Sequence, residues 1–136
     1  MAAKSEVTNE ASALKPLRGL VPMAHVADVG RSIEFYRQIG FEVANTLVVS
    51  QRVQWAWVKS GTAHMMLVCS ERPMNPEAQH GVLFYLYAQD VAGYRDQLLA
   101  RGVKVSELSY PEYARPAGEF AMSDPDGYCL LVGQGN

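Results

Sequence analysis

The sequence has few cysteines, no long apolar run and no excess of basic residues, and each absence excludes a class of protein. Cys69 and Cys129 lie in apolar stretches without metal-ligand spacing, which favours two buried thiols over a disulfide. No apolar run reaches the roughly 18 residues of a membrane-spanning helix. A formal net charge of −2 is not the basic balance of a nucleic-acid-binding protein. We therefore expect neither a membrane nor a nucleic-acid partner.

The start of the chain is polar. Residues 1–18 carry small and charged side chains without sustained periodicity, which predicts a mobile tail. This stretch also lacks the apolar core of a signal peptide, so a cytoplasmic location is expected. The following residues, 19–136, have the length of one compact domain, and 49% of the sequence is apolar, enough to bury a core.

One pattern occurs twice in this domain. In each copy an apolar run leads into Asp-Val, and a glycine stands twelve residues after the Asp: Asp28 and Gly40, then Asp90 and Gly102. An Asp side chain accepts hydrogen bonds from the free N–H groups of a first helical turn, and Gly adopts the left-handed conformation after the last turn. Each copy therefore predicts a strand, a helix of about three turns and a further strand.

Strand-like runs at residues 42–49, 54–59 and 62–69 follow the first helix, with Gly61 in a tight hairpin between the last two. This hairpin places Trp55, Trp57, His64, Met66 and Val68 on one face. For the two tryptophans, core packing beneath a helix is favoured, and stacking on a ligand is the alternative. His64 is expected to be a partly exposed imidazole.

The second copy repeats this order of elements. Its four expected strands span residues 82–88, 103–108, 119–123 and 129–133. Asp-Pro-Asp-Gly at 124–127 predicts a type I turn between the last two of them. The spacing thus predicts two βαβββ units, about residues 20–69 and 81–134, joined by a linker over 70–80.

Short motifs in both units carry a family resemblance. They are Val-Ala-Asp-Val-Gly-Arg-Ser-Ile-Glu-Phe-Tyr at 26–36, Gly-Phe-Glu at 40–42, Gly-Glu-Phe at 118–120 and Asp-Pro-Asp-Gly-Tyr at 124–128. Together they resemble the vicinal oxygen chelate superfamily, which includes glyoxalase I, bleomycin-resistance proteins and extradiol dioxygenases. The resemblance covers about residues 20–134. It implies an α+β fold in which tandem βαβββ modules form curved mixed sheets with a concave groove and helices on the outer face.

In metal-using members of this family, His, Gln or Glu from the first and fourth strands of each module hold a divalent ion. The corresponding positions here are apolar: Val21, Met65, Leu83 and Leu131. Such side chains are poor ligands for a divalent ion, so we expect neither a metal at the usual site nor another cofactor. Other residues with ligand chemistry show no zinc-like pairing: His25, His64, His80, Glu119, Asp126 and Cys129.

Strand alternation places His25 on the same face as Val21, and Tyr85 and Tyr87 on the same face as Leu83. The resemblance makes this the groove face, where two phenols offer ring area and hydroxyl groups to a ligand. The alternative for the tyrosines is a dimer contact or a half-exposed sheet. His25 is a candidate for ligand contact or proton transfer, or else a strand-end histidine bonded to backbone.

An aromatic, proline-containing insertion occupies residues 110–116 of the second unit. Its Tyr110, Tyr113 and Arg115 are expected to form either a lid over the end of the groove or an ordinary surface loop. As a lid, they would join His25, Tyr85 and Tyr87 as ligand-binding residues.

Two hypotheses of function follow. The favoured one is a metal-independent binding protein for an aromatic or planar small molecule, similar to the bleomycin-resistance branch and not an enzyme; the near-neutral charge argues against strongly cationic bleomycin itself. The alternative is a lyase, isomerase or dioxygenase of the same superfamily, with a displaced metal site or acid–base catalysis by His25 with Tyr85. A homodimer is expected because open sheets leave unpaired edges and family members commonly pair.

Overall fold

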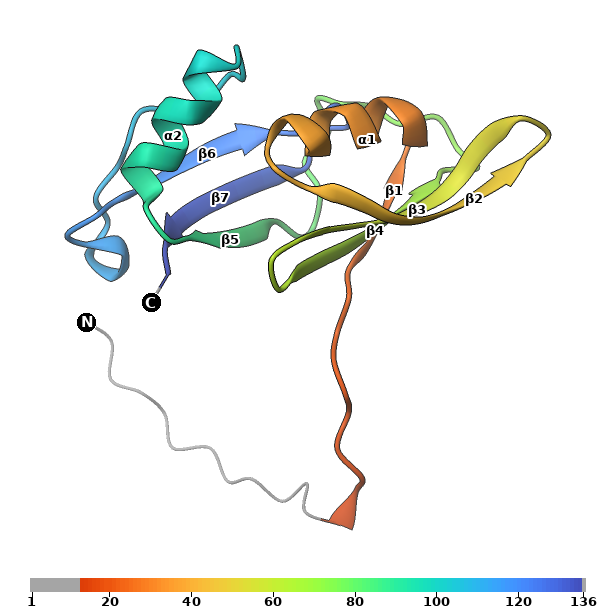
Figure 1. Ribbon diagram of the computed structural model, residues 1–136, viewed down its shortest axis with the longest axis horizontal. Coiled ribbons are helices and arrows are strands. Elements are labelled where there is room, and N and C mark those ends of the chain that lie inside the picture. Colours follow the sequence, from red (N-terminus) through yellow and green to blue (C-terminus); the bar gives the residue numbers. More distant parts are fainter. Residues whose placement is uncertain (1–12, 136) are drawn as a thin grey trace.

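The computed structural model describes residues 13–135, which form two sheets and two α-helices (Figure 1). In chain order the elements are β1 (Met23–Val26), α1 (Val29–Gln38), β2 (Glu42–Val49), β3 (Arg52–Ser60), β4 (Ala63–Cys69), β5 (Phe84–Ala88), α2 (Val91–Ala100), the short 3₁₀ helix η2 (Glu112–Ala114), β6 (Glu119–Ser123) and β7 (Cys129–Gln134). None of the described helices is long and apolar enough to cross a membrane.

Both sheets are mixed. The first has the strand order β1-β4-β3-β2 and the second the order β5-β7-β6. In each sheet the strand that precedes the helix pairs in parallel with the last strand of its unit, and the other pairs are antiparallel. Figure 1 shows α1 and α2 on the same side of the molecule, where α1 packs against β2, β3 and β4 and α2 against β5 and β7. The predicted α+β class, with mixed sheets and helices outside, is confirmed.

The helix boundaries follow the predicted capping residues. Asp28 Oδ1 accepts a hydrogen bond from the Arg31 amide at 3.1 Å, and Asp90 caps α2 in the same way. Gly40 and Gly102 have φ angles of 105° and 81°, a conformation that side chains with a Cβ atom rarely adopt. Both ends of both helices are therefore fixed by local sequence.

The core lies between the helices and the sheets. The buried residues of α1 are Val29, Ser32, Ile33 and Tyr36. Alternate residues of β3 and β4 complete this part of the core, namely Ala56, Val58, Met65 and Leu67. Met65 was assigned to one of the family's metal positions, which lie in the groove. This assignment is wrong, because its side chain is on the helix-covered face.

The tryptophan pair lies on the face opposite α1. Trp55 and Trp57 alternate with the buried Ala56 and Val58, so core packing beneath the helix, the favoured interpretation, is wrong. Their rings stand edge to face with centroids 6.5 Å apart. Trp57 Nε1 donates a hydrogen bond to Nδ1 of the exposed His64 at 3.0 Å, which holds the indole on this open face.

The expected strand over residues 103–108 is not regular. It runs beside β6, but Ser106 interrupts the ladder, because its hydroxyl accepts a hydrogen bond from the Ala121 amide at 2.8 Å. The Ala121 carbonyl accepts the Ser106 amide, and one further bridge joins Ser109 to Glu119. The second unit therefore has three regular strands where four were predicted.

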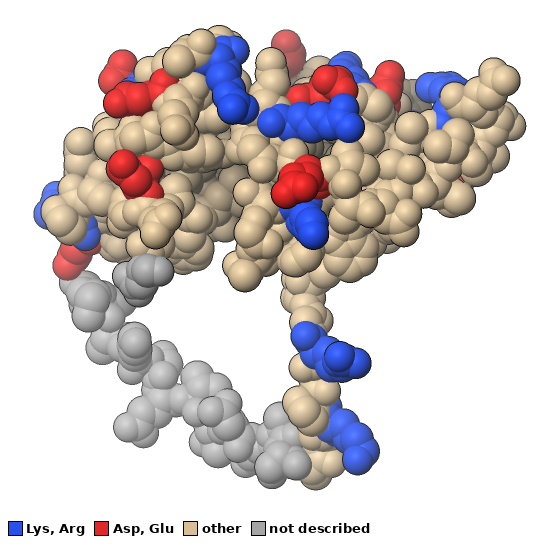
Figure 2. All heavy atoms as spheres, viewed as in Figure 1, with Lys and Arg blue, Asp and Glu red and all other residues tan. Residues whose placement is uncertain are grey.

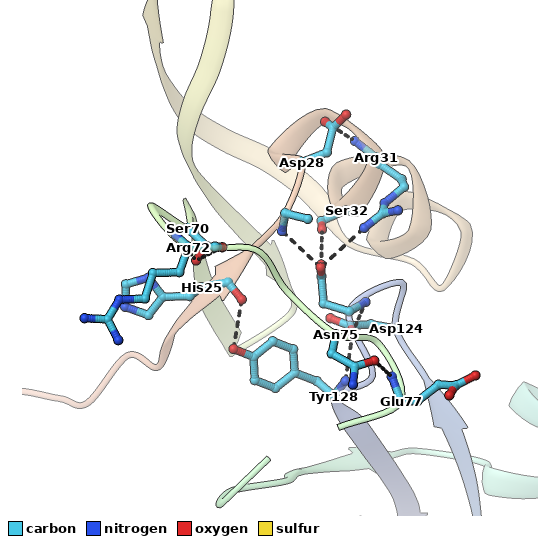
Figure 3. A network of polar contacts seen from close by, with 12 residues as sticks. His25, Asp28, Arg31, Ser32, Ser70, Arg72, Asn75, Glu77, Asp124 and Tyr128 are labelled. Atoms are coloured by element: carbon cyan, nitrogen blue, oxygen red, sulfur yellow. Dashed lines mark hydrogen bonds and ion pairs between the residues drawn. The ribbon is translucent and has the colours of Figure 1, made fainter. Parts of the chain in front are cut away.

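A buried carboxylate of the β6–β7 turn joins the two units (Figure 3). Asp126 is 1% exposed and accepts hydrogen bonds from the Ala27 amide at 3.0 Å and the Ser32 hydroxyl at 3.4 Å. Arg31 adds an ion pair at 3.3 Å. Three groups at the start of α1 thus meet one side chain of the other unit, which gives Asp126 a structural role.

The second carboxylate of this turn, Asp124, closes the turn itself. Its Oδ1 accepts the amides of Asp126 and Tyr128 at 2.9 Å each, and Oδ2 accepts the hydroxyl of Tyr36 at 2.9 Å. Burial raises the pKa of Asp124, and burial together with the nearby carboxylates raises the pKa of Tyr36. The predicted type I turn is confirmed by the Gly127 amide, which donates to the Asp124 carbonyl at 3.0 Å.

Residues 13–22 form a segment, here called the arm, that leaves β1 and runs away from both sheets (Figure 1). Every side chain from 13 to 20 is exposed. Three leucines follow one another at intervals of three residues, and Leu14, Leu17 and Leu20 are 77%, 92% and 86% exposed. Most of the tail expected over residues 1–18 lies outside the described residues.

Candidate functional site

Each sheet has one face toward the helix layer and one face turned away from it. The first open face carries alternate residues of β1, β3 and β4: Met23, His25, Trp55, Trp57, Met66 and Val68. The second open face carries alternate residues of β5, β6 and β7: Tyr85, Tyr87, Glu119, Ala121, Leu131 and Gly133. The groove that the sequence predicts would be formed by these two faces.

The residues at the family's metal positions do not suit a divalent ion. In the second unit Leu131 pairs with Tyr85, and in the first unit Met66 pairs with Met23, so Met66 is the counterpart that was assigned to Met65. Val21 and Leu83 complete the set by alternation. Hydrocarbon and thioether groups at all four positions are unsuited to hold such an ion. In residues 13–135 no three His, Cys, Asp or Glu side chains gather elsewhere into a metal-binding group.

Glu119 is a buried carboxylate on the second open face, with 6% of its surface exposed. The Tyr85 hydroxyl donates a hydrogen bond to Oε2 at 2.8 Å, and the Tyr113 hydroxyl donates to Oε1 at 2.7 Å. The three side chains come from β6, β5 and η2. A strand, its neighbour across the sheet and the insertion loop therefore converge on one acidic group.

Gly133 makes this arrangement possible. Strand β7 lies between β5 and β6, so the Tyr85 side chain must cross it to reach Glu119. A Cβ atom at Gly133 would stand 2.3 Å from the Tyr85 hydroxyl oxygen, closer than two unbonded atoms can approach. The tyrosine passes over β7 because this one residue has no side chain.

Within residues 13–135, no basic side chain forms an ion pair with the Glu119 carboxylate. The ion pairs found in the described part of the chain are Arg31–Asp126, Arg37–Glu34 and Arg95–Glu107. Burial, followed by the hydrogen bond to Glu119, raises the pKa of Tyr85, and the corresponding hydrogen bond raises the pKa of Tyr113. Both phenols consequently stay protonated and keep donating to the carboxylate.

Tyr87 extends the site as an open aromatic surface. Its ring centroid lies 5.1 Å from that of Tyr85 at an angle of 46°, and 74% of the residue is exposed. Of the predicted ligand-binding residues, Tyr85 and Tyr113 thus meet at Glu119, and Tyr87 adjoins Tyr85. Tyr110 and Arg115 instead brace the loop, where Arg115 Nε donates to the Tyr110 carbonyl at 2.9 Å.

His25 stands apart from this group. It belongs to β1 of the first sheet, is exposed, and its carbonyl accepts the Tyr128 hydroxyl at 2.8 Å. No hydrogen bond or ring contact joins its imidazole to Tyr85 or Tyr87 within residues 13–135. Placement at the rim of the same site therefore stays a prediction.

A cleft of about 640 Å³ lies between the two units, and the surface is hollowed there in Figure 2. Its walls are the turn after α1 (residues 39–41), the β3–β4 hairpin (60–63), the end of β5 with the turn that follows it (86–90), and Gly93, Tyr94 and Gln97 of α2. The Tyr94 hydroxyl donates to the Ile39 carbonyl at this boundary, and burial raises the pKa of Tyr94 to about 12. The sequence did not predict this cleft, because its walls come from both units.

Comparison with known proteins identifies the family. A model described as the Glyoxalase/Bleomycin resistance protein/Dioxygenase superfamily matches residues 21–131. The chain belongs to this superfamily. None of the curated proteins searched matches the sequence.

Solved structures share the fold of this superfamily member. One, a bleomycin resistance determinant encoded on the transposon Tn5, has a TM-score of 0.71 at 17% identity, over 88% of this chain and 99% of that one. Another is the bleomycin-binding protein of Streptomyces verticillus complexed with copper(II)-bleomycin, with a TM-score of 0.68 at 19% identity over 90% and 100%. A third is TnmS3, an antibiotic binding protein from Streptomyces sp. CB03234, with a TM-score of 0.67 at 22% identity over 90% and 99%.

The sequence analysis of this superfamily member missed Glu119 and Gly133 as site residues. Glu119 was considered only as a metal ligand. The signal was nevertheless present, because alternation along β6 puts Phe120 and Met122 in the core and leaves Glu119 on the open face. An acidic residue in an otherwise apolar strand calls for a polar partner, although alternation does not show which one.

Proposed function

We propose that this superfamily member is a binding protein for a planar or aromatic small molecule and that it works without the family's usual metal site. The observation that carries the proposal is the pair Tyr85 and Tyr87, exposed aromatic area beside a buried carboxylate on an open sheet face. The apolar residues at the metal positions support the metal-free part. Structures with the same fold include proteins whose names describe bleomycin or antibiotic binding.

The ligand stacks on the tyrosine rings. Stacking of a base on an aromatic side chain in nucleic-acid sites is worth about 1–3 kcal/mol, and the same scale is expected here. Loss of one ring should then weaken binding by roughly 5- to 150-fold.

The test begins with a thermal-shift screen of planar aromatic compounds. Tyr87→Ala is the informative variant, because Tyr87 is exposed, its side chain forms no hydrogen bond within residues 13–135, and it can be removed without disturbing the core. Leu99→Ala, which removes an exposed apolar side chain on α2, is the matched control. Unchanged affinity in folded Tyr87→Ala would show that the ligand binds elsewhere, and the first open face with Trp55 and Trp57 would be tested next.

Elemental analysis tests the metal-free part. We expect no stoichiometric divalent metal after dialysis without chelator, since Val21, Met66, Leu83 and Leu131 offer no suitable ligand. About one metal ion per chain would contradict this and favour the enzyme alternative. Acid–base catalysis by His25 with Tyr85 has no support from a contact between the two residues within residues 13–135. The cytoplasmic location stays a prediction.

We also propose a homodimer in which a second copy covers the arm and the open faces. The exposed leucines of the arm form an apolar surface that water does not favour, and the edge strands β1, β2 and β5 have unpaired backbone groups. The double variant Leu17→Ser with Leu20→Ser should dissociate the dimer in light scattering, whereas Leu99→Ser should not. A parent protein of about the 15.0 kDa monomer mass throughout the micromolar range would contradict the dimer.

A further inference from the structure

Glu119 differs from the other buried carboxylates of the described chain in its partners. Asp126 has Arg31 as an ionic partner, and Asp124 accepts two amides of its own turn besides the Tyr36 hydroxyl. Within residues 13–135 the side-chain partners of Glu119 are two phenols, and both donate to it, so both of its oxygens act as acceptors, as in an ionised carboxylate. A buried charge without a counter-charge is costly, and this cost is removed when a cation binds.

The surroundings of Glu119 match the chemistry that holds a positively charged nitrogen. A carboxylate has about four acceptor directions, and the two tyrosines use two of them. The faces of tyrosine rings attract cations, and the ring of Tyr87 adjoins that of Tyr85, whose hydroxyl bonds the carboxylate. Tyr113, which is 70% exposed, covers the other oxygen from the short helix η2. Acceptor, ring faces and an outer cover are therefore assembled on one open face.

We propose that Glu119, Tyr85 and Tyr87 recognise a ligand that carries one cationic nitrogen, an amine or amidine, on a planar aromatic group. The inference rests on the proposed function and names the ligand class of the same surface. One carboxylate balances one charge, which agrees with the near-neutral chain and distinguishes this ligand from a strongly cationic one.

The probes are 9-aminoacridine, which is cationic at neutral pH, and acridone, a neutral compound with the same three fused rings. Both are fluorescent, so anisotropy titration gives their affinities directly. The parent protein should bind 9-aminoacridine at least about tenfold more tightly than acridone, because a hydrogen bond to a charged group is the stronger kind. Added salt should weaken only the binding of the cation. This comparison requires no substitution and therefore holds even if a variant fails to fold.

Glu119→Gln is the decisive variant. The amide keeps one acceptor and gains donors, so both phenols retain a partner, and the unbalanced charge is removed. The melting temperature should therefore not fall. Affinity for 9-aminoacridine should drop about tenfold or more, and affinity for acridone should stay unchanged. Glu34→Gln, an equal change of net charge on the exposed side of α1, should alter neither affinity.

Four results would overturn the inference. Equal binding of the two probes to the parent, with no effect of Glu119→Gln, would contradict the preference for a cationic ligand, while the proposed binding of an aromatic ligand would stand. An equal loss of both probes in Glu119→Gln makes Glu119 a structural support. If Glu119→Gln weakens the dimer and keeps its affinity for the probes, the carboxylate instead forms an ion pair with a basic residue in the arm of the second copy. If neither probe binds, the proposed function fails on these aromatic compounds, and the inference fails with it.

Discussion

The two units share one plan and carry different chemistry on their open faces. Both have a capped helix, a parallel strand pair and glycine at the helix end, and the helix packs on the buried face of its sheet. On the first open face Trp57 donates to a neutral ring nitrogen of His64, whereas on the second two phenols donate to the carboxylate of Glu119. The scaffold constrains the buried face, and the open face is free to change its ligand chemistry.

One pair of equivalent positions accounts for much of this difference. Val68 stands two residues after Met66, and Gly133 stands two residues after Leu131, so both occupy the same place in their units. The valine fills the space above its strand, whereas the glycine leaves room for Tyr85 to cross. A polar site in the second unit thus depends on a missing side chain.

The largest expected effect comes from separating the two units. Asp126→Ala leaves the Ala27 amide and the buried Ser32 hydroxyl without their acceptor and should lower the free energy of unfolding by about 2–4 kcal/mol. Urea denaturation measures this change. Asp96→Ala on the exposed side of α2 is the control, and a loss of less than about 0.5 kcal/mol in Asp126→Ala would show that the units are held together by other contacts.

The next largest effect concerns the crossing over β7. Gly133→Ala should displace Tyr85 and cost about 1–3 kcal/mol by overpacking, whereas Val68→Ala at the equivalent position only opens space on a half-exposed face. Ultraviolet titration of the phenols should also show the Tyr85 pKa returning toward its ordinary value in Gly133→Ala. An unperturbed titration curve would mean that the ring does not cross the strand.

Alkaline pH should distinguish the second unit from the first. Because the folded-state pKa of Tyr85 is raised, its stabilising contribution is complete below the unfolded value of about 10 and is lost as pH rises toward the folded value. Glu119→Gln removes part of this upward shift, so it should lose less stability than the parent between about pH 9 and about pH 12. Tyr36 and Tyr94 titrate in both proteins and cancel in the comparison. Parallel stability curves would contradict the coupling of Tyr85 to Glu119.

The smallest effect is expected on the first open face. Trp57→Phe removes the hydrogen bond to the exposed His64 and should cost at most about 1 kcal/mol, because water can replace the donor. Thermal unfolding measures it, with the fluorescence of Trp55 as a check of local structure. A loss above about 2 kcal/mol would indicate that the indole is buried by a partner, as in the proposed dimer.

The success of sequence analysis depended on how local each feature is. Asp28 and Gly40 act within one helix, and alternation within the β3–β4 hairpin was predicted correctly. Two errors arose where a second element decides. Nothing within β3 shows which face α1 covers, so the tryptophans were favoured for the core. The assignment of Met65 to a metal position rested on its distance from Gly61 in the sequence, and it ignored the strand pairing that selects Met66 instead.

The polar site was beyond local patterns for the same reason. Glu119 receives its donors from Tyr85 and Tyr113, residues 34 and 6 positions away, and the crossing depends on Gly133 of a third strand. The irregular course of residues 103–108 also turns on a single hydroxyl of Ser106, which competes with the backbone ladder. Such contacts are decided only when the sheets are assembled.

The hydrogen bond between the Ala27 amide and Asp126 has a consequence for how the chain folds. It joins residues 99 positions apart, so it forms only after most of the chain has collapsed into place. Each unit buries part of its surface against the other, and neither half of the bond has a substitute within its own unit. The two units should therefore lose their structure in one cooperative transition. A chain that stops before the β6–β7 turn should leave the Ala27 amide and the Ser32 hydroxyl, at the start of α1, without their hydrogen-bond acceptor.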